Sequence, residues 1–235
     1  MAAFDRYAAK VEAHLEVQHT RADGFVAGDG ALAERAKLKR GELSLENLVP
    51  ADAAEKDGAM LHHWRGTAFV PGATAAQFEQ VLLDYRDYPR RFAPEVVRAA
   101  IVSRSADELR AKLRFRQKHV LIVVLDATYD VRFGQLDTGH RYSISRSTSI
   151  KEIWRAGSPA ERTLSVREEH GFLWRQNTYW SCEEQDGGLL IQIETISLTR
   201  AIPHGLGWAL RPYVESIPRE TLDFTLTRVR DALRR

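Results

Sequence analysis

The sequence predicts an α+β fold in which a curved antiparallel sheet wraps around a long C-terminal helix, with an N-terminal helical extension. Three observations predict it. From residue 61 to about residue 200, apolar and polar residues alternate in one segment after another, which is the pattern of strands with one covered face. One helical segment interrupts these strands early. A long helical segment closes the chain, and no other long helix is available that late to cover the sheet.

The first 60 residues predict a helix followed by an extended arm. Phe4, Tyr7, Val11 and Leu15 recur at helical spacing, and the stretch "RADGFVAGDG" then ends the helix with its glycines. Residues 31–60 are charged and weakly patterned, which indicates a short helix and an arm. We therefore expect residues 1–60 to form an N-terminal helix and arm, and residues 61–235 to form one domain.

The strands and helices of the main domain follow in order. "LHHWRGTAFVPG" predicts a strand closed by Pro-Gly, and the next segment predicts a helix capped by Thr74. Alternating strands are expected from "VVRAAIVSR", "ELRAKLRFRQK", "VLIVVLDATYDVRF", "HRYSISRSTSIKEI", "GFLWRQNTYWSCEE" and, after a tight turn at residues 186–188, "LLIQIETISLTR". The last helix is expected to begin near Pro218, with an apolar stripe formed by Leu222, Leu226, Val229 and Leu233.

This order of elements, with three stretches of sequence, resembles the START-like superfamily, also called helix-grip or SRPBCC proteins. The stretches are "HHWRGTAFVPGAT", "GFLWRQNTYW" and "SLTRAIPHGLGWALRPYVESIPRETLDFTL". They look most like a bacterial branch of uncharacterised START-like proteins, and the resemblance covers the chain from Leu61 to its C-terminus. Members of the superfamily include lipid-transfer domains, polyketide cyclases and aromatases, and plant hormone receptors. The resemblance implies a deep apolar cavity between the sheet and the last helix.

The segment before the last helix is unusually apolar for a connector. Leu206, Trp208 and Leu210 lie among prolines and glycines, whereas loops are normally polar. In the superfamily this connector lies near the cavity mouth, which implies a lid with Trp208 against the ligand. The alternative is that Trp208 closes the end of a filled core, because apolar residues pack more often than they gate.

One strand carries side chains suited to a ligand pocket. Trp174 and Trp180 share a face with Gln176 and Thr178, and Tyr142 is expected on the same side of the sheet. Pockets are mostly apolar with a few placed polar groups. A solid core disfavours the two polar residues, because an unpaired buried polar group costs about 1–3 kcal/mol. We therefore expect these residues to line a pocket; a filled aromatic core is the alternative.

Arg146 is the candidate polar anchor of that pocket. It shares strand parity with Tyr142 and Ile150, which points it toward the covered face. A buried guanidinium needs a partner, and we expect Glu194 on the return strand to supply it, although the parity of Glu194 is ambiguous. The alternative is a bulge that turns Arg146 to solvent. The predicted ligand-binding set is thus Arg146, Trp174, Gln176, Thr178, Trp180, Tyr142, Glu194 and Trp208.

Several classes of site have no signature here. The adjacent His62 and His63 face opposite sides of a strand, and the single Cys182 gives no multi-thiolate site, so we expect no metal. A phosphate-binding loop, a dinucleotide glycine fingerprint and a G-x-S-x-G elbow are all missing from the sequence, and we expect no cofactor.

Charge and hydropathy limit the partners. The net charge is +2, and the basic ladder at residues 110–118 faces carboxylates on the next strand and lacks stacking aromatics, which argues against nucleic acid. The longest apolar run, residues 120–125, is far too short to span a bilayer, and no export signal is visible. We expect a soluble protein, cytoplasmic or exported. Peripheral membrane contact and oligomeric state stay open.

The function that these observations favour is binding of an apolar small molecule, such as a lipid, fatty acid, isoprenoid or polyketide. An enzyme of the cyclase or aromatase type is the alternative, and a module that binds no ligand is a third. The sequence offers no strong acid–base pair, so it assigns no catalytic residue and favours binding.

Overall fold

The structure is a computed structural model, and it describes residues 1–27, 32–50, 53–56, 58–118, 122–201 and 207–234. The helices are α1 (Ala2–Gln18), α2 (Leu32–Lys39), α3 (Ala75–Leu83), α4 (Tyr88–Arg91) and α5 (Gly207–Leu233). The strands are β1 (Ser44–Asn47), β2 (Glu55–Lys56), β3 (Ala59–Pro71), β4 (Val96–Ser105), β5 (Glu108–Lys118), β6 (Ile122–Gln135), β7 (His140–Trp154), β8 (Arg162–Thr163), β9 (Arg175–Gln185) and β10 (Gly188–Arg200).

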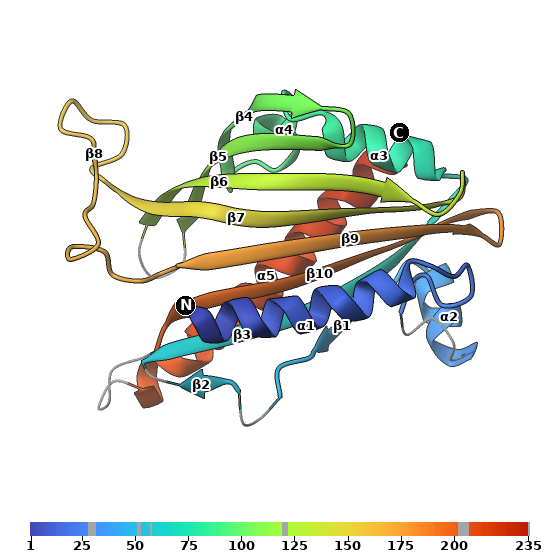
Figure 1. Cartoon of the computed structure of the whole chain (residues 1–235), viewed down its shortest axis with the longest axis horizontal. Coiled ribbons are helices and arrows are strands. Elements are labelled where there is room, and N and C mark those ends of the chain that lie inside the picture. The colour runs from blue at the N-terminus through green and yellow to red at the C-terminus, as the bar shows by residue number, and fades with distance from the viewer. Residues whose placement is uncertain (28–31, 51–52, 57, 119–121, 202–206, 235) are drawn as a thin grey trace.

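The strands form one antiparallel sheet that curves around α5 (Figure 1). Its order is β1-β3-β10-β9-β7-β6-β5-β4, with β2 paired to β3 and β8 paired to β7. Helix α3 lies between β3 and β4 in the chain, and Thr74 caps it as predicted, its hydroxyl accepting a hydrogen bond from the Gln77 N–H. The predicted α+β fold, a curved antiparallel sheet around a long C-terminal helix, is confirmed.

The apolar stripe of α5 packs against the concave face of the sheet. The predicted stripe residues are all buried there, in one cluster with apolar side chains of β3 and β10: Leu222, Leu226, Val229 and Leu233. At Gly66 on β3 the helix comes so close that a Cβ would lie 3.1 Å from a methyl of Leu222 and of Leu226. Only glycine allows this approach without a shift of its neighbours.

The start of α5 differs from the prediction. The helix begins at Gly207 rather than near Pro218, so it includes Pro212 and Pro218. A proline removes one backbone hydrogen bond and bends a helix, but it does not always end one. The residues predicted to form a broken connector are therefore partly helical.

A second layer covers the convex face, which the one-sided strand pattern did not predict. Helix α1 lies across this face, and its Phe4, Ala8 and Leu15 are buried against Ile144 of β7 and Ile196 of β10 (Figure 1). The N-terminal helix was predicted, but its site was not. The residues beneath it include the buried polar side chains of His63 and Glu194, so no apolar alternation marks this face as covered.

The predicted basic ladder of β5 is paired with β6. Arg110 makes two hydrogen bonds to Asp130, of 2.6 and 3.0 Å, and Arg114 makes two to Asp126, of 2.6 and 2.7 Å. The register of the two strands places each arginine opposite its carboxylate. Cross-strand pairing thus neutralises part of the ladder, as expected.

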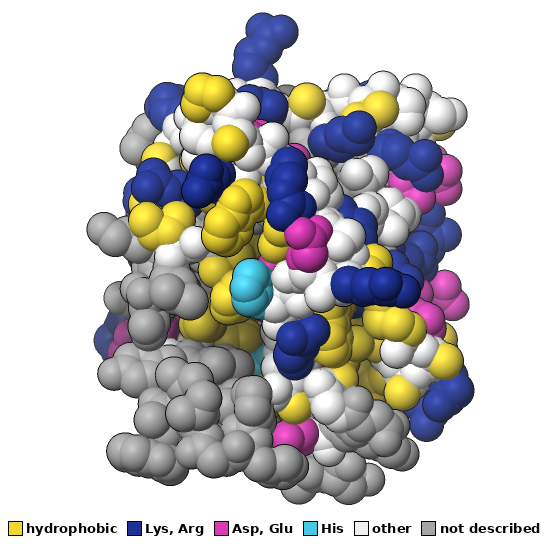
Figure 2. All heavy atoms as spheres, turned by 90° about the vertical axis from the view of Figure 1, so that its left-hand side faces the viewer, with side chains coloured by type: hydrophobic (Ala, Val, Ile, Leu, Met, Phe, Trp, Pro, Cys, Tyr) yellow, Lys and Arg dark blue, Asp and Glu magenta, His cyan; other side chains and the backbone are white. Residues whose placement is uncertain are grey.

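Apolar side chains are exposed at the end of the molecule where β8 lies. Ile122, Trp154 and Phe172 are among them, and the Arg155 guanidinium lies over the Trp154 ring. Figure 2 shows this end, with hydrophobic side chains gathered between Lys and Arg side chains.

Candidate ligand cavity

A cavity of about 220 Å³ lies between the concave face of the sheet and α5. One wall is apolar and largely aromatic, and it is formed by the segment from α3 to β6. Its members include Tyr85, Tyr88, Phe92, Leu113, Phe115 and Leu125. The lining also includes Gln117 and Phe172, and Phe172 is exposed. A concave, mostly apolar space of this kind is typical of small-molecule sites.

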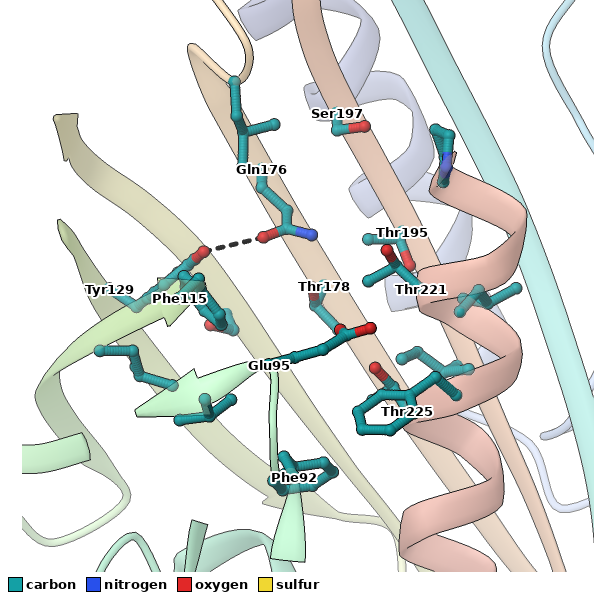
Figure 3. A pocket seen from close by; sticks show the side chains of 18 of the residues that line it. Phe92, Glu95, Phe115, Tyr129, Gln176, Thr178, Thr195, Ser197, Thr221 and Thr225 are labelled. Atoms are coloured by element: carbon teal, nitrogen blue, oxygen red, sulfur yellow. Dashed lines mark hydrogen bonds between the residues drawn. The ribbon is translucent and has the colours of Figure 1, made fainter. Parts of the chain in front are cut away.

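The opposite wall carries neutral polar side chains from β7, β9, β10 and α5 (Figure 3). They include Ser143, Ser145, Thr178, Thr195, Thr221 and Thr225. Gln176 lies in the same wall and accepts a hydrogen bond of 2.8 Å from the Tyr129 hydroxyl. Burial raises the pKa of Tyr129, so this phenol stays protonated and donates. The amide NH₂ group of Gln176 and the wall hydroxyls are groups that a ligand oxygen could contact.

Glu95 is the one acidic residue among the described lining residues. It precedes β4, and its side chain reaches into the cavity toward β9 and α5 (Figure 3). Burial raises the pKa of its carboxyl; Arg228 opposes that shift and Glu220 adds to it.

Three of the predicted ligand-binding residues line the cavity. Gln176, Thr178 and Trp180 all point inward from β9, as their shared parity predicts. Trp180 is buried, and its ring meets Phe78 of α3 edge-on at 5.6 Å between centroids. Trp174 precedes β9 and does not line the cavity; it packs against the cluster beneath α1 and under the Arg200 guanidinium.

The prediction for Arg146 and Tyr142 is wrong, because both lie on the convex face. Arg146 has a side chain 44% exposed and pairs with Glu12 of α1, and Tyr142 stacks on His19. The register of β6 and β7 shifts between Thr128 and Tyr129, so β7 holds one extra residue there. Such a bulge reverses the parity of a strand. Ile150 therefore faces inward, whereas before the bulge Tyr142, Ile144 and Arg146 face α1. Ser143 and Ser145, on the other parity, line the cavity.

The predicted pairing of Arg146 with Glu194 is also wrong. Glu194 is buried on the convex face, where it accepts hydrogen bonds from His63 Nε2 at 2.8 Å and from Arg65 Nε at 2.9 Å. Burial opposes ionisation of Glu194, but the hydrogen bonds and charges of His63 and Arg65 outweigh it and hold its pKa below the usual value. Tyr7 of α1 completes the cluster through a 2.7 Å hydrogen bond to His63 Nδ1.

The predicted connector residues lie outside the described part of the chain. Leu206 is not described, and of Trp208 and Leu210 only the helical backbone is. Whether Trp208 acts as a lid or as a plug stays a prediction.

Sequence reasoning missed the α5 and β10 hydroxyls and Glu95. Thr221 and Thr225 lie four residues apart beside the apolar stripe of α5, and Thr195 alternates with the inward Ile193. A polar residue that shares the inward side of a strand or helix with apolar residues could therefore have been recognised as a cavity-lining candidate. Glu95 lies outside any periodic segment, and no pattern marks it.

The adjacent histidines face opposite sides of β3, as predicted. His63 binds the convex cluster, and His62 is buried with its Nε2 3.1 Å from the Thr199 hydroxyl. Within the described residues, no group of three or more His, Cys, Asp or Glu side chains is placed to hold a metal ion.

Comparison with solved structures identifies the fold. The STAR-related lipid transfer protein (fragment 25–204) from Xanthomonas axonopodis aligns with a TM-score of 0.51 at 17% identity, over 82% of this chain and 99% of that one. The chain has the START-like helix-grip fold. Human STARD10 aligns with a TM-score of 0.50 at 10% identity, over 86% of this chain and 77% of that one.

A third helix-grip structure is the Zhui aromatase/cyclase from Streptomyces sp. R1128. It aligns with a TM-score of 0.50 at 17% identity, over 74% of this chain and 95% of that one. No protein-family model and no curated protein sequence matches the chain. At these identities the shared property is the fold, and the same fold supports unrelated functions. None of the helices in the described ranges is both long and apolar enough to cross a bilayer.

Proposed function

We propose that this protein binds a mostly apolar small molecule in the cavity between the sheet and α5. The observation that carries the proposal is the cavity itself, in which an aromatic wall faces a wall of neutral hydroxyl and amide groups. A filled core would replace those hydroxyls by apolar side chains, since an unpaired buried polar group is costly. The similar structures add support, because their names include lipid-transfer proteins.

Binding is favoured over catalysis by the chemistry of the described lining. It offers one carboxyl, Glu95, and no histidine to pair with it. Cys182 is buried in the core, and desolvation raises the pKa of its thiol to about 12, which removes it as a nucleophile. A cyclase-type enzyme remains the second candidate, favoured by the similarity to an aromatase/cyclase and by the single inward acid.

The proposal assigns a role to each of the two parts of the chain. Residues 61–235 form the ligand-binding domain, and residues 1–60 supply a helix that covers its convex face and an arm whose strands β1 and β2 extend the sheet beside β3. The burial of Phe4 and Leu15 against the sheet supports this role for the N-terminal helix.

A pair of threonine variants on α5 tests the proposal. Thr225 lines the cavity, whereas Thr227, two residues on, hydrogen-bonds Asp223 on the exposed side of the helix. Nile red, a neutral dye that fluoresces in apolar surroundings, is titrated into the wild-type protein and into each variant. Thr225→Phe should fill the cavity and weaken dye binding about tenfold or more. Thr227→Phe should leave the affinity unchanged.

Urea unfolding of the same variants separates blocking from misfolding. Phe at position 225 occupies existing space, so its free energy of unfolding should equal or exceed that of the wild type. If Nile red binds wild type and Thr225→Phe equally while both are folded, the dye does not occupy this cavity and the proposal fails.

A further inference from the structure

Among the described residues, the charged groups that line the cavity are all of one sign. No Lys, Arg or His belongs to its described lining, and the one ionisable carboxyl is that of Glu95. No described residue donates a hydrogen bond to that carboxyl; only charges at a distance act on it. An anionic ligand group placed in this space would meet no described counter-ion, and it would meet a carboxyl of its own sign.

Neutral polar groups dominate the wall that Glu95 faces. Its side chain points toward Thr178 on β9 and Thr225 on α5 (Figure 3). Hydroxyl and amide groups of this kind can donate hydrogen bonds to a neutral ligand oxygen, so that no charge has to be buried in the cavity. The opposite aromatic wall leaves the rest of a ligand in apolar contact.

We propose that the cavity selects neutral ligands that carry a carbonyl or hydroxyl oxygen on an apolar body, with the wall hydroxyls and the Gln176 amide contacting that oxygen and the Glu95 carboxylate excluding anionic groups. This inference rests on the proposed function, since it names the class of ligand for the same cavity. A fatty acid in its anionic form is disfavoured, and a neutral ketone, ester or alcohol is favoured.

Burial and two charged residues of α5 act on the Glu95 carboxyl. Burial raises its pKa, and Glu220 of α5 raises it further, whereas Arg228 of α5 lowers it. Arg228 is exposed, lies over the Phe224 ring at 5.0 Å and donates to the Ala93 carbonyl, so it belongs to the rim rather than to the cavity. A cation at the rim also disfavours cationic ligands.

The phenols around Glu95 add no charge to the cavity. Burial raises the pKa of Tyr85, Tyr88 and Tyr129, so these stay protonated. Arg116 of β5 donates its backbone N–H to the Glu95 carbonyl.

Four ligands with one chain length test the selection: decan-2-one, decan-1-ol, decanoate and decylamine, each displacing Nile red. The wild type should bind the ketone and the alcohol about tenfold or more tightly than decanoate at neutral pH. Glu95→Gln keeps the size of the side chain and removes its charge. It should narrow the ketone-to-decanoate ratio about tenfold while changing ketone affinity by no more than about twofold. The ratio between variants cancels differences in how the ligands partition from water.

The pH dependence gives a second measurement. The ketone-to-decanoate ratio of the wild type should narrow as the pH falls and Glu95 is protonated, and in Glu95→Gln it should narrow less, because there only the ligand titrates. Glu108→Gln, an exposed carboxylate change on β5, is the control and should behave as the wild type.

Three outcomes would overturn the inference. An unchanged ketone-to-decanoate ratio in Glu95→Gln removes Glu95 from ligand selection, even though ligands still bind and the proposed function stands. Tightest binding of decylamine, lost in Glu95→Gln, makes the site a cation receptor. A wild-type preference for decanoate shows that the cavity takes anions. If none of the four ligands and no dye binds, the proposed function itself fails.

Discussion

Arg146 and Glu12 form a two-point ion pair across the convex face of the sheet, with Nε and Nη2 each 2.8 Å from a carboxylate oxygen. The same carboxylate accepts a 2.9 Å hydrogen bond from the Tyr179 hydroxyl. The pair therefore joins α1 to β7 and β9, on the side of the sheet away from the cavity.

Replacing Arg146 should affect stability and not ligand binding. Arg146→Met should lower the free energy of unfolding by about 0.5–1 kcal/mol, because the guanidinium is nearly half exposed and such pairs contribute little. Nile red affinity should equal that of the wild type. Urea unfolding and dye titration measure the two effects. A large loss of Nile red affinity with unchanged stability would indicate that Arg146 contacts the ligand.

Glu194 should contribute far more to the free energy of unfolding than the exposed carboxylates near it. Glu194→Gln removes the buried charge that Arg65 and His63 share, which leaves a guanidinium only 14% exposed with poor compensation. We expect a loss of about 3 kcal/mol in the free energy of unfolding.

Glu46→Gln is the matched control for this variant. Glu46 lies 3.8 Å from Arg65 with a side chain 43% exposed, so its loss should cost less than about 1 kcal/mol. Equal effects of the two substitutions in urea unfolding would show that the buried cluster contributes no more than a surface pair.

Two buried histidines should make the fold sensitive to mild acid. Burial lowers the pKa of His19 and of His62 to about 4, although the charge of Glu194 partly offsets the shift of His19. Below the pKa of an unfolded histidine, near 6.5, the unfolded chain binds protons that the folded chain does not, so stability falls as the pH falls. Each histidine should cost about 2 kcal/mol between about pH 7.5 and about pH 5.

Urea unfolding across that pH range measures the loss. His62→Gln should remove about half of the decrease, because glutamine keeps a donor for Thr199 and does not titrate. His14→Gln, an exposed position on α1, should leave the slope unchanged. A wild-type stability that is flat between these pH values would contradict the burial of both rings in neutral form.

The close approach of α5 to β3 depends on Gly66. A Cβ there would lie 3.1 Å from methyl groups of Leu222, Leu226 and Leu45, so Gly66→Ala forces side chains apart and should cost about 1–3 kcal/mol. At Gly139 the nearest contact would be an ordinary 3.4 Å, and Gly139→Ala should change the free energy of unfolding by less than about 0.5 kcal/mol. Thermal unfolding of both variants compares them. A harmless Gly66→Ala would mean that α5 shifts freely on the sheet.

Period-two alternation predicted the sheet and the inward face of β9, because each residue of an unbroken strand alternates sides. Gln176, Thr178 and Trp180 were placed correctly for this reason. The same rule failed on β7, where one extra residue reverses the parity and carries Arg146 to the other face. Nothing in the alternation marks such a residue, since both faces of β7 carry polar side chains.

The convex layer could not be predicted from strand patterns either. Glu194 was expected in the cavity because its parity could be read either way, and His63 carried no sign of which element would cover it. Both are buried on the convex face beneath α1, which lies far away in sequence. Glu95 was missed for a related reason, since only the fold brings it to the cavity.

The methyl spectrum of threonine-labelled protein, followed during titration with decan-2-one, tests the central claim most directly. The account predicts saturable shifts for the methyls of Thr178, Thr195 and Thr225, which line the cavity, and none for Thr227 on the outer side of α5 or Thr20 after α1. Saturable shifts confined to the second group, or none in either group at saturating ligand, would contradict it.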